Sequence, residues 1–203
     1  SGAMTALEPP LASLGPESRL PLIDIALPAL RQLDAETATR FLDIVKRLAA
    51  ADEKTTLFEF TLQKILQHHL GRTTAESRQP AKYYAIRALL PETTILLSAL
   101  AHAGNGAADR AQQAFAIGVR RLSLGSQPVS FLPREGWDLA AVDAALDKFA
   151  LAAPGVKRLI LRAGAECIAT DGTVTRDEAE LLRAVADTLD CPMPPFGGAA
   201  ANT

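Results

Sequence analysis

The sequence contains few aromatic residues and no apolar segment long enough to cross a membrane. Phe, Trp and Tyr together make up 5% of its 203 residues, and Ala and Leu dominate its hydrophobic share. Because strands favour aromatic and β-branched residues whereas Ala and Leu favour helices, this bias predicts an all-α fold. The longest apolar stretches, such as residues 95–101, fall well short of the roughly 20 residues that a membrane-spanning helix needs. We therefore expect no direct membrane insertion.

The sequence also lacks an excess of charge and a recognisable catalytic motif. Its 21 Lys and Arg residues nearly balance 23 Asp and Glu residues, so no strong field attracts nucleic acid. The motifs HExxH, GxSxG and GxGxxG and the P-loop are absent from the chain. Cys167 and Cys191 have no CxxC spacing and are interpreted as reduced thiols. These absences predict a protein that is not an enzyme and holds no organic cofactor.

Apolar residues recur at helical spacing along most of the chain and predict about eight helices. Asp34, Thr56, Asp138 and Thr175 are suitable N-caps, Gly71 is a suitable C-terminal residue, and Pro28 is expected to kink or break its helix. The predicted helices cover residues 22–33, 35–51, 56–70, 91–104, 107–122, 138–152, 154–170 and 176–189, with a further short candidate at 83–90.

The chain is expected to contain one helical domain between flexible ends. Residues 1–4 resemble the scar of a cleaved expression tag, and residues 5–20 are rich in Pro, Ser, Gly and Ala, which predicts a linker. The helical domain is predicted at 21–196, in two pseudo-repeated bundles at about 21–104 and 105–190. Residues 197–203 are predicted to form a disordered tail.

An internal repeat organises the chain. Residues 47–62 and 166–181 align with an offset of 119 residues. In each segment an apolar helix ends at an aspartate, a short turn follows, and a glutamate lies seven residues after the aspartate. The pairs are Asp52 with Glu59 and Asp171 with Glu178. Because the apolar positions also continue in step, the pattern indicates a duplication.

The repeated acidic residues have two interpretations. The favoured one is helix capping, because residues 56–59 and 175–178 both match the capping box S/T-x-x-E. The alternative is a divalent-cation site with Asp171, Asp177 and Glu178 as oxygen donors. The first copy, Asp52 and Glu59, is a weaker candidate because Glu53 replaces the glycine of the second copy. Neither copy has the ligand spacing of an EF-hand.

Two groups of aromatic and histidine residues are further candidates for function. Tyr83, Tyr84, Phe131 and Trp137 could mark a recognition groove, since aromatic residues anchor interfaces. More often such residues fix a loop to the core. His102 lies alone near a predicted helix end, where a surface role is expected rather than catalysis.

Residues 167–182 resemble the motif of the TerB-like family, named for a tellurite-resistance protein. Residues 22–31, 57–60, 96–100 and 189–195 resemble the cytosolic C-terminal extension of bacterial HtpX-type membrane zinc metalloproteases. This resemblance implies a bundle of two helical halves without peptidase activity, because the zinc-binding HExxH of such a parent protease would lie outside these residues. It also implies metal binding at the acidic positions Asp52, Glu59, Asp171 and Glu178.

We therefore expect a regulatory or docking domain at the cytosolic face of the bacterial inner membrane. Its partner would be another protein, the membrane or protease part of the same polypeptide, or a second copy in a homo-oligomer. One alternative is a module that senses a divalent metal through residues 171–178. Another is a stand-alone stress-response scaffold of the tellurite-resistance type.

Overall fold

The computed structural model describes residues 15, 18–49, 56–71, 80–104, 107–125 and 129–191, and this part of the chain is all-α. The described residues form eight α-helices and two short 3₁₀-helices, with no β-strand. No helix among them has both the length and the apolar character that crossing a bilayer requires. The helices are α2 (Arg19–Leu30), α3 (Ala35–Ala49), α4 (Leu57–Leu70), α5 (Leu90–Ala103), α6 (Ala108–Arg121), α7 (Leu139–Ala150), α8 (Pro154–Ile168) and α9 (Arg176–Thr188).

The helix starts agree with the predicted caps. Asp34 accepts a hydrogen bond from the backbone N–H of Thr37 at 2.9 Å, and Asp138 accepts one from Ala141 at 2.7 Å. Thr56 and Thr175 form complete capping boxes with the glutamates three residues later. Each cap satisfies backbone N–H groups that have no partner within the helix, and local sequence is therefore sufficient to place these four starts.

Two local predictions were wrong, and a third is tested only in part. Pro28 lies inside α2, which continues past it to Leu30, so it does not break the helix at residue 28, while a kink there stays a prediction. Residues 83–90 are not one helix: Tyr83 forms a parallel bridge with Ala152, and only Ile86–Leu89 form a 3₁₀-helix. Gly71 follows α4 with φ −67°, not in the left-handed conformation typical of a terminal glycine.

The buried apolar residues form two clusters. The larger one draws on α5, α6, α7, α8 and α9, and the smaller one joins α2, α3 and α4. Helix α4 belongs to both, because Phe60 lies in the larger cluster whereas Ile65, Leu66 and Leu70 lie in the smaller. Helix α5 packs against α6, α7 and α8, so the predicted division into bundles at residues 104 and 105 is not confirmed.

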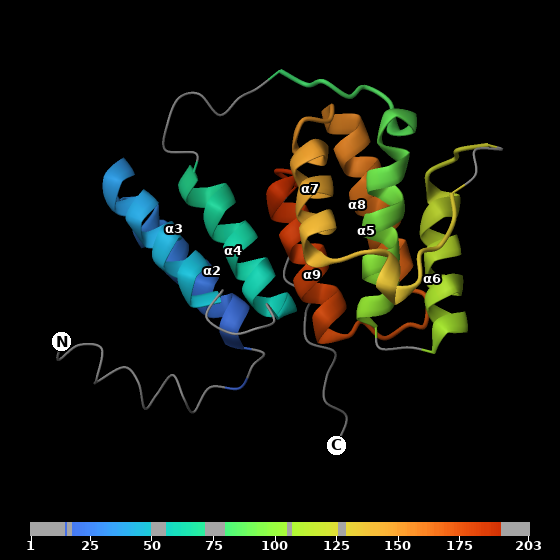
Figure 1. The fold of residues 1–203 in the computed structure, drawn as a ribbon, viewed down its shortest axis with the longest axis horizontal. Coiled ribbons are helices and arrows are strands. Elements are labelled where there is room, and N and C mark those ends of the chain that lie inside the picture. The colour runs from blue at the N-terminus through green and yellow to red at the C-terminus, as the bar shows by residue number, and fades with distance from the viewer. Residues whose placement is uncertain are drawn as a thin grey trace.

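The structure instead repeats a unit of three helices. The offset of 119 residues carries the bounds of α3 onto those of α8, those of α4 onto α9 within one residue, and those of α2 onto α7 within one residue. Helices α5 and α6 lie between the two units in sequence. Figure 1 shows α2, α3 and α4 on one side and α7, α8 and α9 on the other, with α4 next to α9. We call these the first and second repeats.

Equivalent residues of the two repeats make reciprocal contacts. Lys64 of α4 forms an ion pair with Asp143 of α7 at 2.7 Å. Its equivalent on α9, Arg183, forms one with Asp24 of α2, the equivalent of Asp143, also at 2.7 Å. Such reciprocity is the signature of packing about a two-fold axis. The Thr61 hydroxyl donates to the carbonyl oxygen of its own equivalent, Glu180, at 3.3 Å, which places this local axis between α4 and α9.

Candidate functional site

The glutamates of both repeats, Glu59 and Glu178, are engaged in helix caps. The Oε2 atom of Glu178 accepts hydrogen bonds from the backbone N–H of Thr175 at 2.7 Å and from its hydroxyl at 2.8 Å. Glu59 accepts the same two bonds from Thr56, at 2.7 and 2.9 Å. The capping interpretation is thus confirmed for both glutamates.

The structure brings together only part of the predicted metal site. Asp171 and Glu178 line a cavity of about 270 Å³, which Arg110 and Cys167 also line. Asp177 lines a different cavity, and Asp52 lies outside the described residues. Within the described ranges, no three His, Cys, Asp or Glu side chains are grouped so that they could hold a metal ion. Metal binding through these residues stays a prediction.

Burial makes the two capping glutamates unequal. Glu178 is buried beneath the turn after α5, where a Cβ on Gly104 would lie 2.6 Å from its Oε1 atom. Desolvation raises the pKa of Glu178, and the nearby charge of Asp171 adds to this effect. Glu59 is half-buried, and the hydrogen bonds from the backbone and hydroxyl of Thr56 lower its pKa. The two glutamates therefore occupy the same motif, but the pKa of Glu178 is raised and that of Glu59 is lowered.

This difference predicts that the stability changes caused by Glu59→Gln and Glu178→Gln depend on pH in opposite directions. Glutamine is the suitable replacement because it also completes a capping box but carries no titratable group. The raised pKa of Glu178 means that the wild type loses stability relative to Glu178→Gln as pH rises above the ordinary value of 4.5. The lowered pKa of Glu59 means that the wild type gains stability relative to Glu59→Gln as pH rises toward 4.5. Urea unfolding of the three proteins at several pH values measures both differences. Two differences of the same sign would contradict the burial argument.

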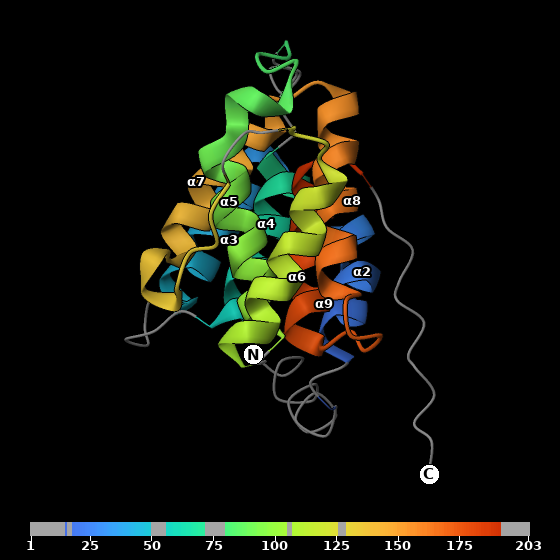
Figure 2. The ribbon, with the colours of Figure 1, turned by 90° about the vertical axis from the view of Figure 1, so that its right-hand side faces the viewer.

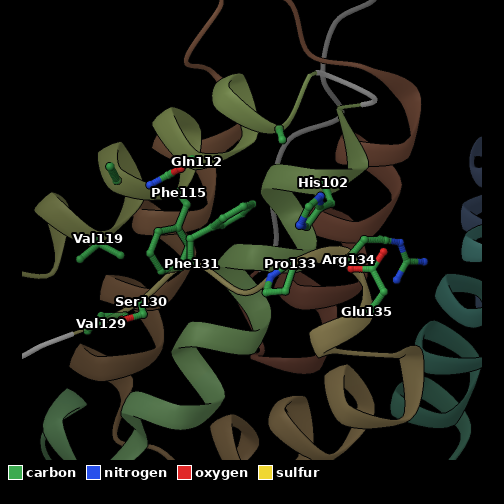
Figure 3. A pocket seen from close by; sticks show the side chains of 12 residues that line it. His102, Gln112, Phe115, Val119, Val129, Ser130, Phe131, Pro133, Arg134 and Glu135 are labelled. Atoms are coloured by element: carbon green, nitrogen blue, oxygen red, sulfur yellow. The ribbon is translucent and has the colours of Figure 1, made fainter.

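A larger groove lies between α6 and the segment of residues 129–135. Its volume is about 860 Å³, within the range of ligand-binding clefts. Aromatic and aliphatic side chains form its surface, with Gln112, Ser130, Arg134 and Glu135 adding polar groups (Figure 3). The lining residues are His102, Ala108, Gln112, Phe115, Ala116, Val119, Val129, Ser130, Phe131, Pro133, Arg134 and Glu135. Helix α6 forms the face of the molecule seen in Figure 2.

Helix α5 fixes one wall of this groove. The Nε2–H group of His102 donates to the carbonyl oxygen of Leu132 at 3.0 Å, and the backbone N–H of Leu132 donates to the Ser98 hydroxyl at 3.1 Å. The His102 ring stacks on Phe131 at 4.8 Å between centroids, and Phe131 contacts Phe115 at 5.5 Å. These contacts hold the extended segment in place, so the groove exists before any ligand binds.

Trp137 lies next to Arg134, one of the residues that line the groove. The Arg134 guanidinium lies over the indole ring, 4.1 Å from its centroid. The Nε1–H group of Trp137 is buried and has no hydrogen-bond partner among the described residues. Trp137 lines a second, smaller cavity of about 200 Å³ that shares His102 and Arg134 with the groove. A buried donor without a partner gains from an acceptor that a ligand or water brings.

The sequence identified the groove only in part. Of the four aromatic residues predicted to mark a recognition groove, Phe131 lines it and Trp137 lines the smaller neighbouring cavity. His102, predicted to lie alone at a helix end, stacks on Phe131 and lines the groove. Tyr84 instead is 75% exposed, and Tyr83 pairs with Ala152. Sequence reasoning missed the contribution of α6, made chiefly by Phe115 and Val119. The only signal was the spacing of apolar residues along α6, which equally fits an ordinary core face.

The chemistry of the groove suits binding. The proton on Nε2 of His102 is committed to a backbone carbonyl, and the Ser98 hydroxyl is buried and accepts a backbone N–H. Cys167, the thiol nearest Glu178, is also buried, and desolvation raises its pKa to about 12, so it stays a thiol at neutral pH. A mainly apolar, preformed surface with a polar rim is typical of recognition sites.

The chain was compared with protein-family models, curated proteins and solved structures, and none of them matches it. The TerB-like resemblance and the membrane-protease parent therefore stay expectations drawn from the sequence.

Proposed function

We propose that this protein is a non-catalytic interaction domain that binds an apolar side chain of a partner polypeptide in the α6 groove. The observation that carries this proposal is the preformed, largely apolar groove of about 860 Å³ between α6 and residues 129–135. Because α5 holds the groove wall through His102 and Ser98, little side-chain freedom is lost when a ligand enters.

The groove favours an aromatic or long aliphatic anchor. Phe115 and Phe131 lie against each other at 5.5 Å and offer ring faces and edges to an incoming side chain. Arg134 and Glu135 on the rim pair with polar or charged groups that flank the anchor. Such an anchor surrounded by polar contacts is the usual composition of an interaction hot spot.

The kind of partner depends on the parent protein that we propose for this domain. As a cytosolic appendage of a membrane zinc metalloprotease, the domain would hold a segment of the protease itself or of a protein that the protease meets. Such a domain regulates by where it places its partner, and it needs no catalytic group of its own. The parent's zinc would belong to the protease part.

The test uses selection from a phage-displayed peptide library, with Ala116→Arg as the variant that fills the groove. Ala116 is an exposed residue of α6 that lines the groove, so the arginine occupies the cavity without disturbing the core. Ala144→Arg is the matched control, because Ala144 is an exposed alanine of α7 outside the groove lining. We expect selected peptides with an apolar anchor that bind the wild type and Ala144→Arg but lose at least tenfold in affinity for Ala116→Arg, which corresponds to about 1.4 kcal/mol.

Failure has two distinct forms. Selection without any enriched peptide would contradict recognition by an apolar anchor. Enriched peptides that bind Ala116→Arg as well as the wild type would place the interaction site elsewhere on the molecule.

A further inference from the structure

Helix α3 carries an apolar stripe that faces solvent. Ile44 is 48% exposed and Leu48 is 68% exposed, although both belong to a strongly amphipathic helix that packs its other apolar residues on α2 and α4. Ile44 and Leu48 are four residues apart and so lie one turn apart on one face of the helix. Thr37, a polar residue that is also exposed, lies on the same face seven residues before Ile44. Single exposed apolar residues are ordinary, but two large ones side by side indicate a contact surface.

In the second repeat, the equivalent helix face is buried. The equivalents of Thr37, Ile44 and Leu48 on α8 are Val156, Ala163 and Cys167, which are 7%, 0% and 1% exposed. Helix α6 covers the last two, since a Cβ on Gly118 of α6 would lie 2.9 Å from the Ala163 carbonyl oxygen and 3.2 Å from the Cys167 Cβ. The stripe on α3 thus corresponds to a helix-packing face.

Within the described residues, this cover lies on the second repeat. Helices α5 and α6 both pack against that repeat. In Figure 1, α6 lies at one end of the molecule and α3 at the other, while Figure 2 shows α6 in front of α8. Within the described part of the chain, no helix takes the place of α6 on α3.

We propose that a second copy of this chain covers the stripe, with the two α3 helices packed antiparallel about a two-fold axis. This arrangement pairs each stripe with itself, as an isologous interface requires. It also sets the opposite ends of the two helix dipoles side by side. This interface lies on α3, away from the α6 groove, and so it is independent of the proposed peptide binding.

The charges beside the stripe favour this occupant. Glu36, Arg40, Asp43 and Arg47 follow one edge of the stripe at spacings of four, three and four residues. Reversing one helix brings Glu36 toward the partner subunit's Arg47, and Arg40 toward the partner subunit's Asp43. The edge is therefore self-complementary when antiparallel.

The charged residues are available for this exchange. They now form the exposed intrahelical pairs Arg40–Glu36 at 2.8 Å and Arg47–Asp43 at 3.6 Å. Exposed pairs of this kind contribute little to stability. Little stability is therefore lost when these residues leave their intrahelical partners and form ion pairs with a second subunit. At the positions where α8 has the small residues Ala163 and Cys167, α3 has the larger Ile44 and Leu48. Side chains of this size fill the space between two helices that pack at the ordinary interaxial distance.

Sedimentation velocity of the full chain over a concentration series tests the proposal, with Leu48→Glu as the disrupting variant. Ile25→Glu is the matched control, because Ile25 is 76% exposed on α2 and its equivalent, Ala144, is exposed as well. We expect a two-subunit species for the wild type and for Ile25→Glu, and a dissociation constant raised at least tenfold for Leu48→Glu. Circular dichroism checks that each variant is folded.

A charge exchange tests the antiparallel orientation. Arg47→Glu and Glu36→Arg should each weaken self-association, whereas an equimolar mixture of the two should recover it, because the mixed pair restores opposite charges at both ends. A wild type that stays monomeric throughout the series would overturn the proposal. So would equal effects of Leu48→Glu and Ile25→Glu. A mixture that does not associate would overturn the antiparallel pairing.

Discussion

Replacing Phe149 with alanine is expected to lower the free energy of unfolding by about 3–5 kcal/mol, the usual loss for truncating a buried aromatic residue. Phe149 lies in the last turn of α7, is 0% exposed, and belongs to the larger cluster. The cavity that it leaves would be closed in by α5 and α9, which both pack against α7. Urea unfolding followed by circular dichroism measures the change.

The control is the equivalent position of the first repeat. Leu30 corresponds to Phe149 and is only half-buried at the edge of the smaller cluster. Leu30→Ala should therefore cost clearly less, about 1–2 kcal/mol, because the leucine is smaller and part of its side chain already contacts water. Equal losses for the two variants would contradict the unequal burial of the repeats.

Replacing Gly118 with alanine is expected to destabilise the protein by about 1–3 kcal/mol through overpacking between α6 and α8. The added Cβ would lie 2.9 Å from the carbonyl oxygen of Ala163, and backbone atoms cannot move aside as a flexible side chain would. The loss should appear although alanine is intrinsically better in a helix than glycine by about 1 kcal/mol.

Gly155→Ala serves as the matched control for this substitution. Gly155 also lies in a helix, near the start of α8, and a Cβ there would meet no atom within 4 Å. Its replacement should be neutral or mildly stabilising, because only the helix preference acts. Thermal unfolding compares the two variants. A stabilised Gly118→Ala protein would show that α6 and α8 are not in close contact.

Local sequence predicted most of the helices because their signals are local. The caps at Asp34, Thr56, Asp138 and Thr175 each satisfy backbone groups within four residues. Tyr83 was mispredicted because its partner, Ala152, is distant in sequence, and the bridge between them replaces helical hydrogen bonds.

The candidate sites were harder to predict because they depend on tertiary neighbours. The sequence gives Glu59 and Glu178 the same capping motif, but only Glu178 lies beneath Gly104, and only its pKa is raised. Likewise Phe131 could be singled out by residue type, whereas His102 and the α6 side of the groove could not. Chain topology, not residue type, decides which helix faces residues 129–135.

The repeat could be detected from the sequence, but its extent could not. The offset of 119 residues relates α2, α3 and α4 to α7, α8 and α9. The predicted boundary at residues 104 and 105 included α5 in the first unit, because periodicity alone does not show which helices a helix packs against. The reciprocal pairs Lys64–Asp143 and Arg183–Asp24 define the units through their tertiary contacts.

The two repeats thus present different surfaces. The second is covered by α5 and α6, and its cover forms the groove proposed for a partner peptide. The first leaves the α3 stripe of Ile44 and Leu48 exposed, which we propose pairs with a second copy. Because α3 and α6 lie at opposite ends of the molecule (Figure 1), a dimer joined through α3 keeps both grooves open.

Hydrogen–deuterium exchange as a function of protein concentration tests most directly whether the two repeats differ in this way. If α3 is uncovered in one chain and pairs with a second copy, its amides should become more protected as concentration rises, while those of α8, already covered by α6, should not change. Exchange in α3 that is independent of concentration would contradict the use of this face for self-association.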